Sequence, residues 1–165
     1  MPQEHLLRRV PQSAAQMFDL VADVERYPEF LPGCRGLRVV HRSGDRSAGT
    51  IVAEMKVGYK FITERFTCRI TLDRSRSLIQ VDYVDGPLSR LENAWRFRDL
   101  AEGGSEVDFT IAFELSSQRL GMIVNALFDR VFLRFVDAFE ARAQSMHPIY
   151  PGRSPAAGVA SPITS

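Results

Sequence analysis

Hydrophobic and polar positions alternate with a period of two through the middle of the chain, which is typical of β-strands. The segment EVDFTIAFEL shows the pattern most clearly, because Val107, Phe109, Ile111 and Phe113 share one face and polar or small residues occupy the other. Turn signals such as SGD, DGP and EGG separate successive runs. Strands joined as an antiparallel meander are therefore expected at 36–43, 48–59, 60–72, 77–84, 89–100 and 105–115.

Helical patterns lie on either side of these strands. Residues 4–10 predict a first strand, after which Ser13 and Gln16 have the spacing of a capping box that begins a helix at Ala14. The stretch VERYPEFLPGC holds two prolines, so it predicts a short helix followed by a loop. A long helix is expected at 119–146. Its apolar residues cover about half the circumference, more than the stripe of about 100° that a surface helix needs.

The order strand, helix, short helix, six strands and long helix predicts an α+β fold. A curved antiparallel sheet of seven strands would wrap around the long C-terminal helix, with the first strand paired to the last. One helix cannot fill the concave face of such a sheet densely, so an internal cavity is expected. Residues 1–147 are predicted to form this domain. Residues 148–165 hold four prolines and two glycines, which predicts a disordered tail.

Composition and charge exclude several function classes. The 165 residues suffice for one domain, and 21 lysines and arginines against 20 acidic residues leave a net charge of +1. This balance argues against binding to nucleic acid through a general basic field, so no DNA partner is expected. Two cysteines and three separated histidines predict neither a disulfide framework nor a metal site. Without a membrane-spanning run or a signal region, the protein is expected in the cytoplasm.

Strand alternation also directs two polar side chains into the apolar interior. Glu64 shares a strand face with Phe66, and Asn93 shares one with Trp95. A buried polar group needs a hydrogen-bond partner. The partner is either the polar head of a ligand, such as a carbonyl, or an arginine or backbone group at the rim of the sheet. The sequence leaves both alternatives open.

No arrangement typical of an active site accompanies these residues. The chain lacks paired carboxylates on one strand, a G-x-S-x-G motif and a glycine-rich phosphate loop. Cys68 lies on an apolar strand and predicts a buried thiol, and Cys34 has no histidine near it in sequence. The protein is therefore expected not to be an enzyme and to have no catalytic residue, although related pockets do host chemistry.

Four separated segments resemble one known family. VADVERYPEFLPGC, KVGYKFITERFTCRITL, GPLSRLENAWRF and FDRVFLRFVDAFEARA are similar to the bacterial branch of the coenzyme Q-binding START-domain family. That family belongs to the wider helix-grip (START/Bet v 1-like) superfamily with polyketide cyclases, and some bacterial members are known as ribosome-association toxins. The resemblance covers residues 3–145. It departs at Gly33, where the family usually carries an aromatic residue, commonly tryptophan.

The resemblance implies a helix-grip fold with a hydrophobic pocket and, as ligand, coenzyme Q or a similar isoprenoid quinone. The implied role is to bind and deliver this lipid for respiratory electron transport, without catalysis and without a cofactor. Transient membrane contact would follow, with the protein peripheral at the inner face of the membrane. One alternative is a ribosome-association toxin that binds the large ribosomal subunit and blocks subunit joining. The other is a polyketide cyclase or aromatase.

The expected binding site combines inward strand positions with the apolar face of the long helix. The ligand-binding residues predicted on this basis are Leu31, Met55, Tyr59, Glu64, Phe66, Tyr83, Asn93, Trp95, Phe109, Phe128 and Phe132. The loop with two prolines predicts either a cap tucked over the mouth of the cavity or a lid that touches a membrane. Its residues are Tyr27, Phe30, Leu31 and Pro32.

Overall fold

The structure is a computed structural model that describes residues 3–59, 61–115 and 118–148. Within these ranges the backbone alone is described for Tyr59, Ile62, Leu115 and residues 118–131. The predicted disordered tail lies, apart from Pro148, outside the described residues.

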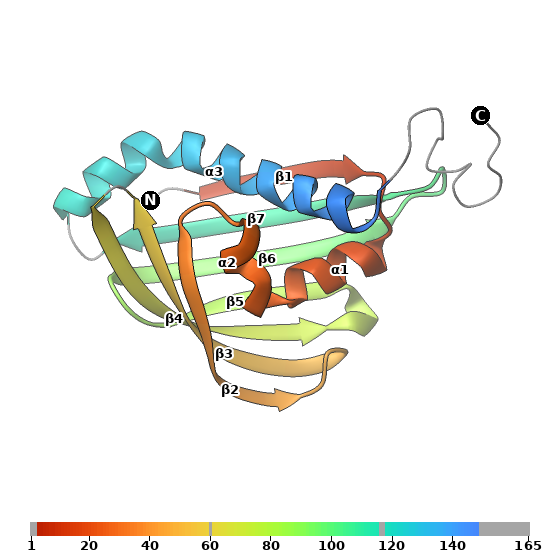
Figure 1. The fold of residues 1–165 in the computed structure, drawn as a ribbon, viewed down its shortest axis with the longest axis horizontal. Helices are drawn as coiled ribbons and strands as arrows, with labels where there is room; N and C mark the ends of the chain where they lie inside the picture. The colour runs from red at the N-terminus through yellow and green to blue at the C-terminus, as the bar shows by residue number, and fades with distance from the viewer. Residues whose placement is uncertain (1–2, 60, 116–117, 149–165) are drawn as a thin grey trace.

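One antiparallel sheet of seven strands forms the body of the molecule (Figure 1). The strands follow in space in the order β1-β7-β6-β5-β4-β3-β2, so the first strand pairs with the last, as the sequence predicts. Every other neighbouring pair is a hairpin of consecutive strands. The strands are β1 (Gln3–Val10), β2 (Cys34–Gly44), β3 (Ala48–Tyr59), β4 (Ile62–Asp73), β5 (Leu78–Asp85), β6 (Leu88–Asp99) and β7 (Ser105–Leu115).

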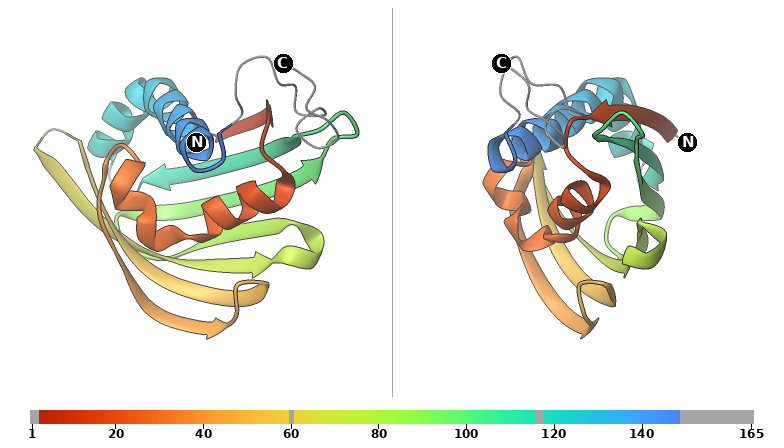
Figure 2. Two further views of the ribbon diagram at one scale, coloured as in Figure 1. Left: turned by 45° about the vertical axis from the view of Figure 1, so that its right-hand side comes forward. Right: turned by 90° about the vertical axis from the view of Figure 1, so that its right-hand side faces the viewer.

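The helices lie on the concave side of this sheet (Figure 2). The predicted capping box is confirmed, because the Ser13 hydroxyl accepts from the Gln16 backbone amide while the Gln16 side chain accepts from the Ser13 amide. The 3₁₀ segments η1 and η2 occupy the turns after α1 and β4. The helical elements are α1 (Ala14–Ala22), η1 (Val24–Arg26), α2 (Tyr27–Phe30), η2 (Arg74–Arg76) and α3 (Gln118–Met146). The predicted α+β fold is thus confirmed.

Two buried polar residues fix the C-terminal end of α3 against the start of the chain. The Gln12 side-chain amide donates to Gln144 Oε1 at 3.3 Å and to the His147 carbonyl at 3.1 Å. The Ser105 hydroxyl donates to the Gln12 carbonyl at 2.9 Å. Because these groups lie away from water, their bonds to one another avoid the penalty of unpaired polar atoms. Among the described helical residues, no stretch is long and apolar enough to span a membrane.

Candidate ligand-binding site

Trp95 lies at the centre of an aromatic cluster between the sheet and the C-terminal half of α3. Its ring centroid is 4.5 Å from that of Phe109 on β7 and 5.0 Å from that of Phe139 on α3. Phe132, about two turns earlier on α3, packs against Phe109 at 5.5 Å. The structure therefore brings together three of the predicted ligand-binding residues, Trp95, Phe109 and Phe132, and adds Phe139.

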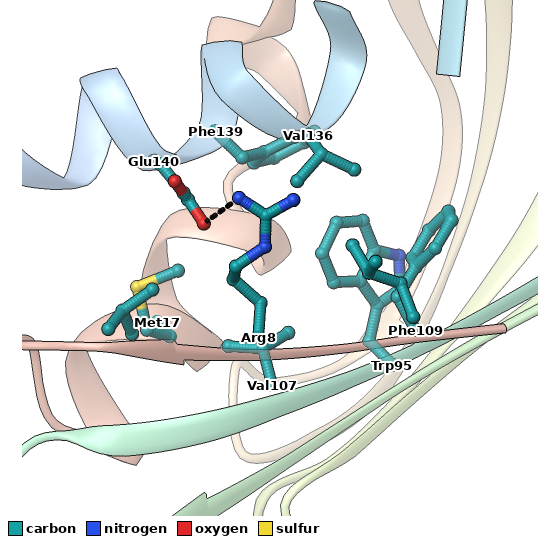
Figure 3. A pocket seen from close by; sticks show the side chains of 10 residues that line it. Arg8, Met17, Trp95, Val107, Phe109, Val136, Phe139 and Glu140 are labelled. Atoms are coloured by element: carbon teal, nitrogen blue, oxygen red, sulfur yellow. Dashed lines mark ion pairs between the residues drawn. The ribbon is translucent and has the colours of Figure 1, made fainter. Parts of the chain in front are cut away.

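A small cavity adjoins this cluster (Figure 3). Its volume of about 30 Å³ holds roughly two water molecules and not a quinone ring. Across it, Arg8 on β1 and Glu140 on α3 form an ion pair with Nη1 and Oε1 3.0 Å apart. The lining residues are Leu6, Arg8, Val10, Met17, Trp95, Val107, Phe109, Val136, Phe139 and Glu140. An elongated cavity reaching Tyr59 and Phe128 remains a prediction, because those two side chains lie outside the described residues.

The inner face of the sheet differs sharply between its two ends. At the end covered by α1, which we call the closed end, the inward side chains of Ile51, Ile70, Ile79, Phe97 and Val107 are buried. Phe18 of α1 packs edge-on against Phe97 there, at 5.9 Å.

At the opposite end, which we call the open end, the same face holds apolar side chains that are only half-buried. They are Met55, Phe66, Tyr83, Leu91 and Phe113. The strand register keeps them adjacent, since Met55 is opposite Phe66 and Leu91 is opposite Phe113. Three of the predicted ligand-binding residues, Met55, Phe66 and Tyr83, are thus grouped at the open end. Tyr83 also accepts a hydrogen bond from the Leu88 amide at 3.0 Å.

Asn93 lies between the two ends and already has partners in the protein. Its Nδ2 donates to the Thr110 carbonyl at 2.8 Å, and its Oδ1 accepts from Trp95 Nε1 at 3.2 Å. The inward direction predicted from strand alternation is correct. The sequence left open whether Asn93 pairs with a ligand or with the protein, and the structure shows a backbone partner together with the indole of Trp95. An amide has a second hydrogen and a second lone pair, so Asn93 can donate one more hydrogen bond and accept one more.

Glu64 stands on the inner face of β4 and is half-buried. It alternates with Phe66 and the buried Cys68, so its predicted direction agrees with the burial pattern. Within the described part of the chain its carboxylate has no hydrogen bond or ion pair. Glu64 and Asn93 belong to strands separated by β5, and the register places Asn93 level with Ile70 of β4. Glu64 lies six positions from Ile70, which separates it from Asn93 by roughly 20 Å along the strand direction, too far for one small ring to contact both.

The proline-containing loop is docked onto α3. Tyr27 and Leu31 are buried, and the Tyr27 hydroxyl donates to the Val21 carbonyl. The Tyr27 and Phe30 rings meet Phe139 edge-on at 5.4 and 5.2 Å. A membrane-touching tip is therefore wrong for Tyr27 and Leu31, because neither side chain reaches the surface. Pro32 is exposed, and the structure agrees with the tucked cap.

Charged groups also hold this loop in place. Glu29 accepts from Arg142 of α3 at 2.7 Å and from Arg26 at 3.2 Å. The hydrogen bond from Arg142 is the main reason that the pKa of Glu29 lies below its ordinary value, with the nearby Arg26 charge adding to it. The Arg142 guanidinium also lies 5.1 Å from the centre of the Phe30 ring.

The structure explains why glycine occupies position 33, where the chain departs from the family it resembles. Its φ of +85° lies in the left-handed region, which strains residues other than glycine. Its carbonyl accepts from the Gly58 amide at 2.8 Å, so the loop after α2 is tied to β3.

Sequence reasoning did not find Arg8, Glu140 or Arg142 as parts of this region. Arg8 and Glu140 are oppositely charged residues on distant elements, and no spacing within either segment predicts their ion pair. Phe139 belongs to the predicted apolar stripe of the long helix, and that stripe is the sequence feature from which its place in the cluster could be predicted.

Both cysteine thiols are expected to resist alkylation in the folded protein. Cys34 and Cys68 are buried, and burial raises the pKa of the Cys34 thiol and, helped by the Asp82 charge, raises that of Cys68 to about 12. At pH 8 the thiolate fraction of each is therefore below that of a free cysteine. Mass spectrometry after iodoacetamide treatment should show no adduct in native protein and two in unfolded protein. Rapid native labelling of either thiol would contradict this.

Comparison with known proteins places this site in context. The model of the family described as "Polyketide cyclase / dehydrase and lipid transport" matches residues 10–140. The ribosome association toxin RatA of Escherichia coli is 33% identical over 147 residues, which cover 89% of this chain and 90% of the relative. The mitochondrial coenzyme Q-binding protein COQ10 homolog B of Xenopus laevis is 34% identical over 137 residues, covering 79% of this chain and 53% of the relative.

A solved structure shows the same architecture. The solution structure of an 18 kDa protein of Caulobacter crescentus is 34% identical and superposes with a TM-score of 0.74. The match covers 90% of this chain and 100% of that one.

Proposed function

The chain belongs to the polyketide cyclase/dehydrase and lipid transport family, and from this premise we propose that it binds coenzyme Q or a similar isoprenoid quinone. The lipid would lie against the inner face of the sheet and be delivered for respiratory electron transport without a chemical step. The protein would work in the cytoplasm and meet the membrane briefly. The similarity to a relative named for coenzyme Q binding supports the ligand class.

The observation that carries this proposal is the incomplete burial of the open end. Met55, Phe66 and Leu91 point to the concave side of the sheet and yet remain half-buried. Apolar surface gains roughly 25 cal/mol for each Å² removed from water. An isoprenoid tail that covered these side chains would therefore be held by the same force that buries the core at the closed end.

Asn93 is the candidate for the polar end of the ligand. It lies between buried Trp95 and half-buried Leu91, so a ring at this point would have its tail at the open end. The spare hydrogen of its amide could donate to a quinone carbonyl while both present bonds persist. Glu64 could donate to a carbonyl only in its protonated form.

Mass spectrometry of an organic extract of the purified protein tests this proposal. We expect quinone in the extract, and we expect a short-tail quinone to quench the fluorescence of Trp95, the single tryptophan. Phe66→Ser should weaken that binding about tenfold, because about half of a phenylalanine's burial is lost.

Val84→Ser is the matched control, since Val84 is exposed on β5 and faces away from the concave side. An extract without quinone, together with no quenching by added quinone, would contradict the proposal. Equal losses in both variants would show that Phe66 does not touch the ligand.

Ribosome association is a second candidate function. The relative named for it matches most of both chains. Several arginines of the outer sheet face are held by carboxylates, including Arg98 by Glu106 at 2.9 Å and Arg90 by Glu92 at 3.0 Å. This pairing weakens a general basic surface for RNA. Cosedimentation with the large ribosomal subunit would separate this candidate from quinone binding, and an assay for turnover would separate polyketide cyclisation from both.

A further inference from the structure

The turn that joins β3 to β4 exposes an aromatic side chain to solvent. Phe61 has 91% of its surface exposed, more than any other large hydrophobic residue in the described part of the chain. Phenylalanine at a hairpin turn contributes nothing to a core when it is so exposed. Single exposed hydrophobics are common, so the residues around Phe61 decide whether it has a role.

Two cations stand directly opposite each other just behind this turn. Lys56 of β3 and Arg65 of β4 are register partners, and both side chains are exposed. Like charges facing each other across an antiparallel pair destabilise a sheet. Neither side chain forms an ion pair within the described residues, so no carboxylate offsets their repulsion there. An anion from outside would relieve this repulsion by pairing with both cations.

A third cation is positioned at the same place by a glycine. The Arg35 guanidinium lies across Gly58 and donates to Thr63 Oγ1 at 2.7 Å. A Cβ atom at Gly58 would come within 2.3 Å of the guanidinium, so the glycine leaves the space that Arg35 occupies.

Two carboxylates close in sequence to Lys56 and Arg65 are paired elsewhere or lie on the other face of the sheet. Glu54, two positions before Lys56, lies 3.7 Å from Arg38. Glu64 is on the inner face of β4, half-buried among apolar side chains. The exposed surface formed by Arg35, Lys56, Phe61 and Arg65, which we call the hairpin surface, is therefore positively charged around one aromatic ring.

This surface adjoins the open end of the sheet. Met55 immediately precedes Lys56 and Phe66 immediately follows Arg65, and successive strand residues point to opposite faces. Lys56 and Arg65 thus lie on the outer face of the sheet, and their chain neighbours Met55 and Phe66 are half-buried on its inner face. Figure 1 shows this hairpin extending beyond the ends of β5 and β6.

We infer that the hairpin surface docks on a membrane that contains anionic lipids, with Phe61 entering the headgroup region and the three cations contacting lipid phosphates. An aromatic side chain together with basic residues is the combination that binds such interfaces. RNA is the less favoured partner, because single-stranded RNA needs several stacking aromatics and Phe61 is the one strongly exposed aromatic among the described residues. The inference rests on the proposed function, since docking would direct the open end toward the lipid that it collects.

Flotation with quinone-free vesicles tests the docking directly. The protein should bind vesicles of phosphatidylcholine with phosphatidylglycerol far better than vesicles of phosphatidylcholine alone, and salt should weaken the binding. Lys56→Gln and Arg65→Gln should each reduce binding about fivefold, the effect of about one charge at an anionic surface. Phe61→Ser should reduce it by about tenfold because an inserted apolar ring is lost.

Matched controls come from residues remote from the hairpin. Leu7→Ser removes an exposed apolar side chain on β1, and Arg46→Gln removes an exposed cation in the turn between β2 and β3, at the other end of β3. Neither should change vesicle binding. Equal binding to both kinds of vesicle, or equal losses in the controls, would overturn the inference. The inference would also be overturned if the protein bound no vesicles and the hairpin variants instead lost cosedimentation with ribosomal subunits.

The outcome is separable from that of the proposed function. Binding of a short-tail quinone in solution, without vesicles, should be unchanged in Phe61→Ser and Lys56→Gln. A protein that binds this quinone but no anionic vesicle would overturn the docking alone, whereas one that binds vesicles but no quinone would overturn the proposed function alone.

Discussion

Replacing Phe139 by alanine is expected to lower the free energy of unfolding by about 3–5 kcal/mol, the usual cost of truncating a buried phenylalanine. Phe139 is 2% exposed and joins three elements. Its ring lies 5.4 Å from Tyr27 of α2, 5.0 Å from Trp95 of β6 and 5.0 Å from Phe135 of its own helix. The void left by the truncation would adjoin the existing small cavity, and the cost of such a change grows with the volume left unfilled.

Denaturant unfolding followed by Trp95 fluorescence would measure this loss. Phe61→Ala is the matched control, because it makes the same chemical change at an exposed site and should alter stability by less than about 0.5 kcal/mol. Phe139→Leu should restore most of the stability by refilling the volume. A loss below about 1 kcal/mol for Phe139→Ala would show that the aromatic cluster does not hold α2 to the sheet.

Placing a carboxylate at Leu31 is expected to be as damaging, for an electrostatic reason. Leu31 is 5% exposed, and its amide donates to the Tyr27 carbonyl at 2.8 Å at the end of α2. Leu31→Asp should lower the free energy of unfolding by about 3 kcal/mol or more at neutral pH, since it removes apolar burial and takes a charge out of water. Pro32→Asp, at the exposed neighbour, is the control and should be far milder.

The pH dependence distinguishes this cause from a simple loss of packing. Burial raises the pKa of the introduced carboxyl above its unfolded value of about 3.9. Between those two pKa values the native state holds the extra proton, so the deficit relative to the unsubstituted protein grows by up to about 1.4 kcal/mol per pH unit as pH rises. Parallel unfolding curves at pH 4 and pH 7 would reveal it. A deficit independent of pH would mean that the loop opens and leaves the carboxylate in water.

Phe139→Ala and Leu31→Asp also test whether the proline-containing loop only stabilises the fold or also controls entry of the ligand. Both weaken the contact of α2 with α3, so each should be compared by quinone retained per folded molecule as well as by stability. The ion pair of Glu29 with Arg142 crosses the same contact on the solvent side. It is exposed at the Glu29 end, and such pairs contribute little to stability.

Local pattern alone was sufficient for the elements and for much of their arrangement. A period of two identified the six strands of the meander, and the Ser13–Gln16 capping box located the start of α1 within a residue. The same alternation correctly directed Asn93 to the side of Trp95. These features depend on residues close together in the chain, so the sequence displays them directly.

Other properties of the site depend on where the helices cross the sheet. Alternation assigned Met55 and Trp95 to the same inner face, but it could not show that Trp95 is buried and Met55 half-buried. That difference exists because Phe135 and Phe139, in the C-terminal half of α3, pack over Trp95. The two-proline loop likewise permitted a buried cap or an exposed tip, and its contact with Phe139 decides for the cap.

By itself, then, the sequence determined an α+β chain whose seven strands carry one apolar face, with a long helix to cover it and with polar Glu64 and Asn93 directed inward. Only the tertiary structure decided that Arg8 meets Glu140, that Arg142 meets Glu29, and that Lys56 faces Arg65 beside an exposed Phe61. The physical reason is that strand period and helix caps are set by neighbouring residues. Ion pairs and exposure instead depend on strand register, sheet curvature and helix position, which bring together residues far apart in the chain.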